Sequence, residues 1–231
     1  MISLGLPALA DEGVLPQPRP FSAMTGLDDG WEPLEFPRID RHSQYRLVEV
    51  DGQQVMVART EAGASGLIAR ISVTPGDRLL LQWRWKVSNT YREGDARRKE
   101  GDDYPARIYV AFKFQEEQAG LFERLKRGTV KALFGEELPG NALNYIWANR
   151  LPAGSIVPNP YTDRTMMVAV SSGDERVGQW VTEERDIVAD YHAAFGEAPP
   201  PIVGIGIMSD ADNTGESATA WYGDIRLRQP E

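Results

Sequence analysis

Strict alternation of apolar and polar residues in two segments constrains the fold of this chain more than any other feature. In residues 79–88 the odd positions are leucine, tryptophan or valine, and the polar residues stand at even positions up to Ser88. Residues 106–114 repeat the pattern with the apolar side chains at even positions. A period of two is typical of strands that have one face on a core and one in solvent. We therefore expect Trp83 and Trp85 in the core of a sheet.

Weaker patterns of the same kind predict about ten strands in all, and Asp51-Gly52 between two of them is a hairpin turn signal. Two segments predict inserted helices. Residues 183–195 have apolar residues at helical spacing, with Thr182 as the predicted N-cap and Gly196 as the predicted end. Residues 121–134 predict a weaker helix, because Gly128 interrupts the pattern. Many strands with inserted rather than alternating helices predict an all-β fold, an antiparallel double-sheet β-sandwich of jelly-roll type. The other predicted strands are 31–36, 45–50, 55–60, 67–73, 143–149, 166–171, 202–209 and 218–227.

Composition narrows the class of partner and the domain organisation. The 231 residues include 25 basic and 34 acidic side chains, a net charge of −9 that disfavours nucleic acid. There is no cysteine, so thiolate chemistry and disulfides are excluded, and no apolar run reaches the ~20 residues of a transmembrane segment. Residues 6–10, Leu-Pro-Ala-Leu-Ala, resemble the end of a signal peptide. We expect a signal-peptide remnant and extended lead-in over 1–20, a single β-sandwich domain over 21–231, and a periplasmic or secreted protein.

The polar rows of the two alternating segments predict a ligand face. If these strands are neighbours, Arg84 and Lys86 lie beside Arg107 and Tyr109 on one cationic surface. Such a surface favours an anionic ligand such as a uronate, a sulfated sugar or another carboxylate, and Tyr109 and Trp147 are candidates for stacking on a sugar ring. The alternative is an ordinary solvated face, because long cationic side chains cover many sheets.

Two acidic loops at strand ends are rich in oxygen ligands. Residues 210–216, Asp-Ala-Asp-Asn-Thr-Gly-Glu, begin like an EF-hand loop, but Thr214 stands at position five and Trp221 at position twelve, where a glutamate is required. This is therefore not an EF-hand, although Ca²⁺ is the ion that such oxygens would hold. The alternative is that the loops are turns whose carboxylates cap backbone donors. The candidate metal ligands are Asp102, Asp103, Asp210, Asp212 and Asn213, and Asp224 is a further candidate for binding ligand hydroxyl groups.

No motif identifies an enzyme. The sequence has no Gly-x-Ser-x-Gly elbow, P-loop or dinucleotide fingerprint, so we predict no catalytic residue. A polysaccharide hydrolase or lyase that uses carboxylates with Tyr109 or Arg107 stays open. Residues 121–134 hold four basic residues and one acidic residue, which predicts either contact with an anionic membrane surface or a lid over the ligand face. The alternative is an insertion that packs through Phe122 and Leu125.

An ordered set of motifs resembles one bacterial family. The motifs are Trp-Arg-Trp-Lys-Val at 83–87, Gly-Asp-Asp-Tyr at 101–104 with Ala-Arg-Ile-Tyr-Val at 106–110, Leu-Asn-Tyr-Ile-Trp-Ala at 143–148, Asp190-Tyr191 with Phe195-Gly196, Ile-Met-Ser-Asp-Ala-Asp-Asn-Thr-Gly at 207–215, and Tyr-Gly-Asp-Ile at 222–225. They resemble the domain-of-unknown-function family 3047 (DUF3047) from about Trp31 to Leu227. The resemblance implies an exported bacterial protein and brings no activity. More loosely, the chain is similar to galactose-binding-like jelly rolls and carbohydrate-binding modules, in which a structural calcium ion is common.

From the sequence we predict a non-catalytic exported β-sandwich that binds a glycan or another polyhydroxy or anionic ligand. A polysaccharide-acting enzyme of the cell envelope and a purely structural or partner-binding module are the alternatives. The residues expected to bind ligand are Arg84, Lys86, Arg107, Tyr109, Trp147 and Asp224.

Overall fold

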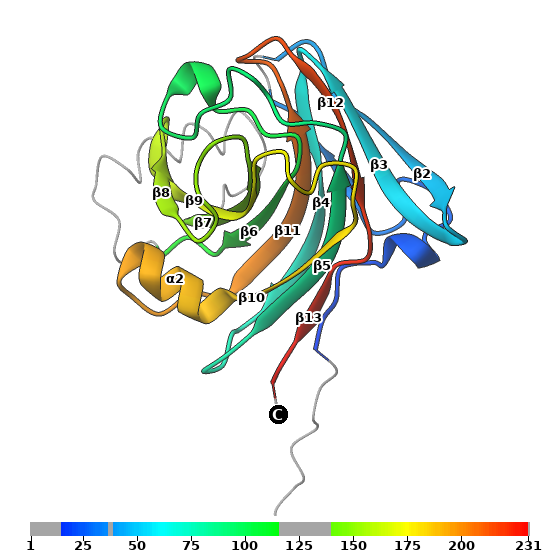
Figure 1. Cartoon of the computed structure of the whole chain (residues 1–231). Coiled ribbons are helices and arrows are strands. Elements are labelled where there is room, and N and C mark those ends of the chain that lie inside the picture. The colour runs from blue at the N-terminus through cyan, green and yellow to red at the C-terminus, as the bar shows by residue number, and fades with distance from the viewer. Residues whose placement is uncertain (1–14, 37–38, 116–139, 231) are drawn as a thin grey trace, which may run out of the picture.

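The computed structural model describes residues 15–36, 39–115 and 140–230, and these form two sheets packed face to face (Figure 1). Sheet A has seven strands in the order β1-β4-β11-β6-β7-β9-β8. They are β1 (Glu32–Leu34), β4 (Ala64–Val73), β11 (Ile202–Asp210), β6 (Arg107–Phe112), β7 (Ala142–Ala148), β9 (Thr162–Ser172) and β8 (Ile156–Asn159). Every neighbouring pair is antiparallel except β7 and β9, which are parallel.

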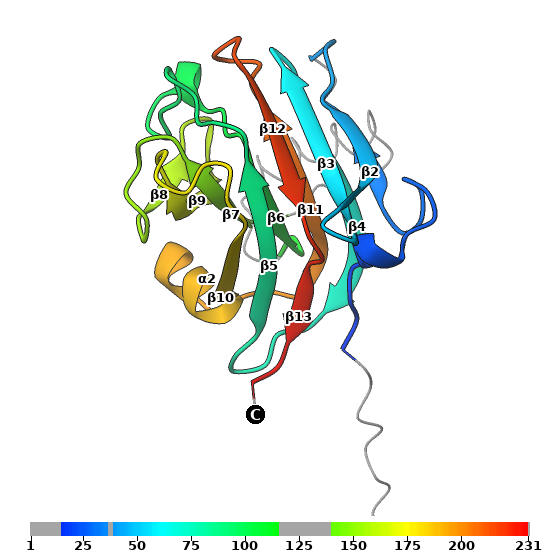
Figure 2. The same cartoon turned by 45° about the vertical axis from the view of Figure 1, so that its right-hand side comes forward.

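Sheet B has six strands, five in the order β10-β5-β12-β3-β2 and a sixth, β13, that also pairs with β5. They are β10 (Val181–Asp186), β5 (Leu80–Val87), β12 (Ser217–Tyr222), β3 (Gln53–Glu61), β2 (Gln44–Val50) and β13 (Arg226–Arg228). Figure 2 shows sheet B from the front, with sheet A behind it. The predicted fold class, an all-β antiparallel double-sheet sandwich of jelly-roll type, is confirmed.

Aromatic side chains from both sheets fill the space between them. Trp83 and Trp85 on β5 are buried, and Trp85 lies 6.0 Å from Trp147 on β7 between ring centroids. Trp83 lies 5.4 Å from Tyr145 on the same facing strand. Pairs of this kind add roughly 0.5–1.5 kcal/mol beyond the area that they bury. The predicted register of both alternating strands is confirmed, since Ile108, like the tryptophans of β5, faces the core.

The helix predicted over 183–195 ends at the predicted residue but begins four residues later than predicted. Val181–Asp186 form the edge strand β10, and helix α2 (Ile187–Phe195) begins only after it. The cap is Asp186, whose side chain accepts hydrogen bonds from the backbone N–H groups of Val188 and Ala189, and not Thr182. The acidic residues before the helix resemble a first helical turn, but they alternate along the edge of a sheet. Gly196 ends α2 in the left-handed region, at φ 76°.

The remaining local elements agree with the sequence. Asp51 and Gly52, at φ 54° and 74°, join β2 to β3 as a tight hairpin turn of the expected kind. Two 3-10 turns, η1 (Phe21–Ala23) and η2 (Lys99–Gly101), complete the described elements. In the part of the chain that the structure describes, no helix is long and apolar enough to cross a membrane. The predicted helix and membrane-contact segment at 121–134 lies outside the described residues.

Candidate functional site

The single cationic face predicted from the two alternating strands does not exist, because the strands lie in different sheets. Arg84 and Lys86 are on β5 of sheet B, whereas Arg107 and Tyr109 are on β6 of sheet A. Both inner faces meet in the core, so the two polar rows point to opposite sides of the sandwich. Alternation fixed which face of each strand is polar, but it carried no information about which strands are neighbours. Each outer face is therefore described separately.

The outer face of sheet B has a row of side chains that crosses four strands. Lys86 pairs in register with Trp221 on β12, Trp221 with Val57 on β3, and Val57 with Arg46 on β2. Trp180, the residue before β10, extends the row at its other end. We call this set, with Arg84 and Arg59 beside it, the tryptophan face.

Cations and indole rings are in direct contact on the tryptophan face. The Lys86 Nζ atom lies 4.5 Å from the centroid of Trp221 and 5.2 Å from that of Trp180. Arg84 Cζ lies 4.5 Å from the centroid of Trp180, and its Nη2 donates to Gln53 Oε1 at 2.7 Å. Both indoles are partly exposed, in contrast to the buried Trp83 and Trp85 of the same sheet. The contacts bring two aromatic side chains and two positive charges together on one face of sheet B.

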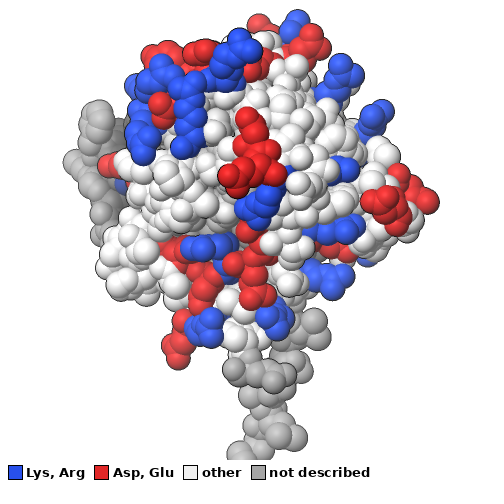
Figure 3. Space-filling view, in the orientation of Figure 1, with Lys and Arg blue, Asp and Glu red and all other residues white. Residues whose placement is uncertain are grey.

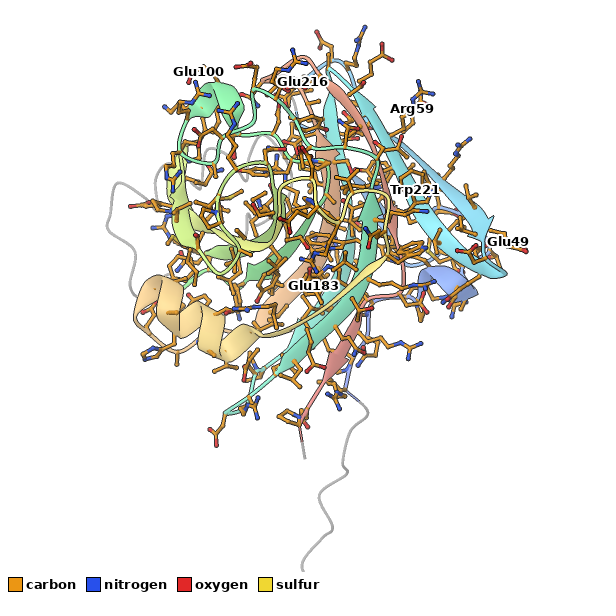
Figure 4. All side chains as sticks on the ribbon, viewed as in Figure 1. Glu49, Arg59, Glu100, Glu183, Glu216 and Trp221 are labelled. Atoms are coloured by element: carbon orange, nitrogen blue, oxygen red, sulfur yellow. The ribbon has the colours of Figure 1, made fainter. Side chains whose placement is uncertain are left out.

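Two hollows adjoin the tryptophan face. The larger, of about 490 Å³, is lined by Trp221, Arg46, Arg59 and polar residues that include Ser88 and Thr219. Figure 4 shows Trp221 and Arg59 on the neighbouring strands β12 and β3, where Trp221 pairs with Val57 and Arg59 pairs with Thr219. The smaller hollow, of about 200 Å³, adjoins the tryptophan face at Arg84. Its lining residues are Gln53, Gln82, Trp83, Arg84, Thr182, Asp224 and Arg226. An extended ligand with hydroxyl and acidic groups would find stacking surfaces, amide and hydroxyl partners, and cations along this face.

Arg107 is buried on the other side of the sandwich, where β6 begins. It is 4% exposed, its Nη2 donates to Asp210 Oδ2, and its Nη1 lies 4.0 Å from Asp102 Oδ1. β6 runs antiparallel to β11 with Arg107 opposite Met208, so Asp210 at the end of β11 reaches the loop that contains Asp102. The sequence predicted that Arg107 is an exposed cation that binds ligand, and this prediction is wrong because the side chain is buried. It neutralises a buried carboxylate.

Four carboxylates gather around this end of sheet A, and we call Asp102, Asp103, Asp210 and Asp212 the acidic cluster. Asp103 accepts hydrogen bonds from Asn213 N at 3.1 Å, Asn213 Nδ2 at 3.1 Å and Thr214 N at 2.5 Å. Burial raises the pKa of Asp102 and of Asp212, and the neighbouring charge of Asp103 raises both further. The structure thus brings together the predicted metal ligands from both acidic loops.

Several buried polar atoms beside Arg107 have no hydrogen-bond partner. They are Asp102 Oδ1, Tyr104 Oη, Arg107 Nε and Asn144 Oδ1. Most buried polar atoms in folded proteins are paired, because an unpaired one costs about 1–3 kcal/mol. Of the described residues, only Tyr91, Trp83 and Trp85 contribute other atoms of this kind. Among the described residues, buried side-chain atoms without a hydrogen bond are therefore concentrated around Arg107.

Tyr109 lies next to this region on the outer face of sheet A. It is partly buried and pairs in register with Asn144 on β7. Its ring centroid is 5.7 Å from Arg107 Cζ. Burial raises the pKa of Tyr109, although the positive charge of Arg107 acts in the opposite direction. The hydroxyl is therefore a proton donor at neutral pH.

Two predicted ligand residues have structural roles. Trp147 is fully buried between the sheets, and its Nε1 donates to the carbonyl oxygen of Gly173, so the prediction that it stacks on a sugar is wrong. Asp224 accepts hydrogen bonds from Ser22 N at 2.9 Å and Ser22 Oγ at 2.6 Å, which attaches η1 to sheet B. Its side chain lines the smaller hollow but is nearly buried.

The sequence reasoning did not select Trp180 and Trp221. For Trp221 a signal was present, because Ala220 and Tyr222 on either side of it belong to the buried set and alternation places Trp221 outward. Trp180 follows a glycine-containing turn, where no periodicity applies. Figure 3 also shows basic side chains over η2 and its flanking loop, where Arg97, Arg98 and Lys99 are exposed.

A family model described as "Protein of unknown function (DUF3047)" matches residues 29–226. No curated protein matches the chain. Among solved structures, the chain is similar to the carbohydrate recognition domain of Emp47p, with 9% identity, 94% of this chain and 95% of that chain covered, and a TM-score of 0.46. It is similar to TmCBM61 in complex with β-1,4-galactotriose, with 9% identity, 92% and 99% covered, and a TM-score of 0.36. The cellulose induced protein Cip1 is 11% identical over 87% and 91%, with a TM-score of 0.42. These similarities concern the fold alone.

Proposed function

This chain belongs to the DUF3047 family, which is described as being of unknown function, and we propose that the protein binds an anionic glycan on the tryptophan face of sheet B. A single observation carries the proposal. Lys86 lies between two partly exposed indole rings, 4.5 Å and 5.2 Å from their centroids, on an open sheet face. Sugar rings stack on partly exposed indole surfaces of this kind through their C–H groups.

The charges of this face favour an acidic saccharide over a neutral one. Arg46, Arg59, Arg84 and Lys86 lie along it, and the acidic residues that line its two hollows are Glu61 and Asp224, the second of which is held by Ser22. The guanidinium groups can donate two parallel hydrogen bonds to one carboxylate or sulfate of the ligand. Exposed charge pairs are screened by salt, so affinity for an acidic ligand will fall as ionic strength rises.

Binding to an open face needs no catalytic group, and we propose a periplasmic or secreted binding protein whose sandwich domain spans 21–231. The support for export is the Leu-Pro-Ala-Leu-Ala pattern at 6–10.

Isothermal titration calorimetry with oligogalacturonates, and with neutral gluco-oligosaccharides of equal length, tests the proposal. We expect binding of the acidic series and about 5- to 160-fold weaker binding by Trp221→Ala, because the substitution removes one stacking surface worth roughly 1–3 kcal/mol. Tyr161→Ala is the matched control, since Tyr161 is 57% exposed and lies outside the tryptophan face. Equal affinity of Trp221→Ala and the unsubstituted protein would remove sheet B as the binding face. Binding of neither series would contradict the proposal itself.

A second candidate function is a polysaccharide-acting enzyme that uses the outer face of sheet A. The specific observation is the set of unpartnered buried atoms on Asp102, Tyr104, Arg107 and Asn144. The raised pKa of Tyr109 disfavours a lyase in which this tyrosine removes a proton, because such a base needs a lowered pKa. A hydrolase needs a carboxyl group as its acid, and Asp102 is the residue to test because its Oδ1 is a buried oxygen without a hydrogen bond. Release of reducing ends from acidic polysaccharides, abolished by Asp102→Asn, would support this candidate over simple binding.

A further inference from the structure

The tryptophan face presents its groups in one row that crosses the strands of sheet B. Trp180 lies beside Lys86, and Lys86 pairs in register with Trp221. Beyond Trp221 the row continues through Val57 to Arg46 on β2. Because β10 and β2 are the two ends of the strand order, the row runs from one side of the sheet to the other.

The spacing of strands sets the distances along this row. Neighbouring strands of a sheet are about 4.8 Å apart, so the backbones that carry Trp180 and Trp221, on either side of β5, are about 9.6 Å apart. Arg46 follows two strands beyond Trp221, which gives a row of about 19 Å from Trp180 to Arg46. A single sugar ring covers only a small part of this length.

The two indole rings are at a separation that suits alternate residues of one saccharide chain. Two strand spacings correspond to about two residues of a 1,4-linked saccharide, and the whole row corresponds to about four. A chain with one ring on Trp180 and the next but one on Trp221 would have its intermediate residue at Lys86, whose Nζ lies 5.2 Å and 4.5 Å from the two indole centroids. The ligand would therefore cross the strands rather than follow them.

The cations of the row are available to a ligand. In the part of the chain that the structure describes, none of Arg46, Arg59, Arg84 and Lys86 is in an ion pair, whereas other arginines such as Arg78 are. Arg84 lies at one end of the row, Lys86 between the indoles, and Arg46 with Arg59 at the other end. Acidic groups must recur along a ligand if it is to meet all of these charges.

On the basis of the glycan binding proposed above, we propose that the ligand is a linear 1,4-linked polyuronate that crosses sheet B from β10 to β2. Alternate sugar rings stack on Trp180 and Trp221, and carboxylates along the chain meet Arg84, Lys86 and Arg46. A saccharide that is shorter than the row, or that has a single acidic residue, makes only some of these contacts.

Calorimetry with two 1,4-linked uronate series, oligogalacturonates and oligomannuronates from the disaccharide to the hexasaccharide, tests the length of the site. We expect affinity to rise about 5- to 160-fold from the disaccharide to the tetrasaccharide, because the second indole becomes engaged, and to change little beyond it. The rise should be largely lost in Trp180→Ala and in Trp221→Ala, since each variant retains one stacking surface. Tyr161→Ala is the matched control and should keep the full rise, because Tyr161 is exposed outside the tryptophan face.

A second comparison tests the recurrence of acidic groups. A tetrasaccharide of neutral residues that ends in one uronate should bind more weakly than a tetrauronate, and the difference should shrink as salt is raised. Equal affinity of these two tetrasaccharides would overturn the polyuronate assignment, and equal affinity of the disaccharide and tetrasaccharide would overturn the crossing of the sheet. Either result leaves the binding of an acidic saccharide, and so the proposed function, intact. Absence of binding by every acidic saccharide would instead contradict the proposed function and this inference with it.

Discussion

Breaking the buried ion pair of Arg107 and Asp210 should be one of the most destabilising single changes in the protein. The two side chains are 4% and 0% exposed, so neither charge can be solvated without opening the end of sheet A. Arg107→Met leaves Asp210 buried beside the carboxylates of Asp103 and Asp212, and we expect a loss of about 3–5 kcal/mol of unfolding free energy. Asp210→Asn leaves Arg107 with Asp102 at 4.0 Å as a partial partner, and should cost less.

A double-mutant cycle separates the pair from its surroundings. Because the double variant Arg107→Met/Asp210→Asn buries neither charge, its loss should be smaller than the sum of the single losses by about 1–3 kcal/mol. Urea unfolding at neutral pH, followed by fluorescence of the buried tryptophans, gives each free energy. Arg228→Met is the control, because Arg228 pairs with Glu184 at the surface, where a salt bridge contributes at most about 1 kcal/mol. A loss in Arg107→Met no larger than in the control, or additive single losses, would show that Arg107 and Asp210 are not a coupled buried pair.

Three further substitutions test the core, the helix cap and a close approach of two segments. Trp83→Ala should cost about 3–5 kcal/mol by leaving a cavity between the sheets, measured by urea unfolding; a loss below about 1 kcal/mol would contradict its core position. Asp186→Ala should cost about 1 kcal/mol at neutral pH, and almost nothing in acid. Burial raises the pKa of Asp186, but hydrogen bonds from Arg78 and backbone amides outweigh burial and lower it. The stability that Asp186 contributes is therefore present above its pKa in the unfolded chain and is lost as pH falls through its pKa in the folded protein. A loss of unfolding free energy that does not change with pH would contradict this. Gly63→Ala should lower the thermal midpoint, because its Cβ would lie 2.4 Å from the carbonyl oxygen of Arg41; an unchanged midpoint would show that the loop moves freely.

Local patterns predicted the strands because alternation reports which side of a strand is buried. The register of Trp83 and Trp85 followed from it directly, and both side chains are in the core. The order of strands could not follow, since β5 and β6 are consecutive strands in the chain yet belong to different sheets. Which strands pair depends on contacts between segments that are far apart in the chain, such as β12 with β3 and β5, and a local sequence pattern does not report such contacts.

The acidic cluster was predicted in its composition but not in its internal roles. Asp102, Asp103, Asp210 and Asp212 were selected because they lie in oxygen-rich loops at strand ends, and the antiparallel pairing of β6 with β11 brings the two loops together. The sequence could not reveal that Arg107 is buried among them, because a polar row on a strand looks the same whether solvent or a loop covers it. Trp147 was misassigned for the related reason that its strand, β7, is buried on both faces and so gives no alternation.

The most direct measurement of the glycan-binding claim is an NMR titration of the six tryptophan indole N–H signals with an oligogalacturonate. Trp31, Trp83, Trp85 and Trp147 are buried, and only Trp180 and Trp221 lie partly exposed on the tryptophan face. Trp180→Phe and Trp221→Phe assign the two signals of that face. We expect these two signals to shift together as the saccharide is added, while the other four stay in place. If the indole signals of Trp180 and Trp221 both stay in place at a saccharide concentration that saturates binding in calorimetry, the tryptophan face is not the binding site.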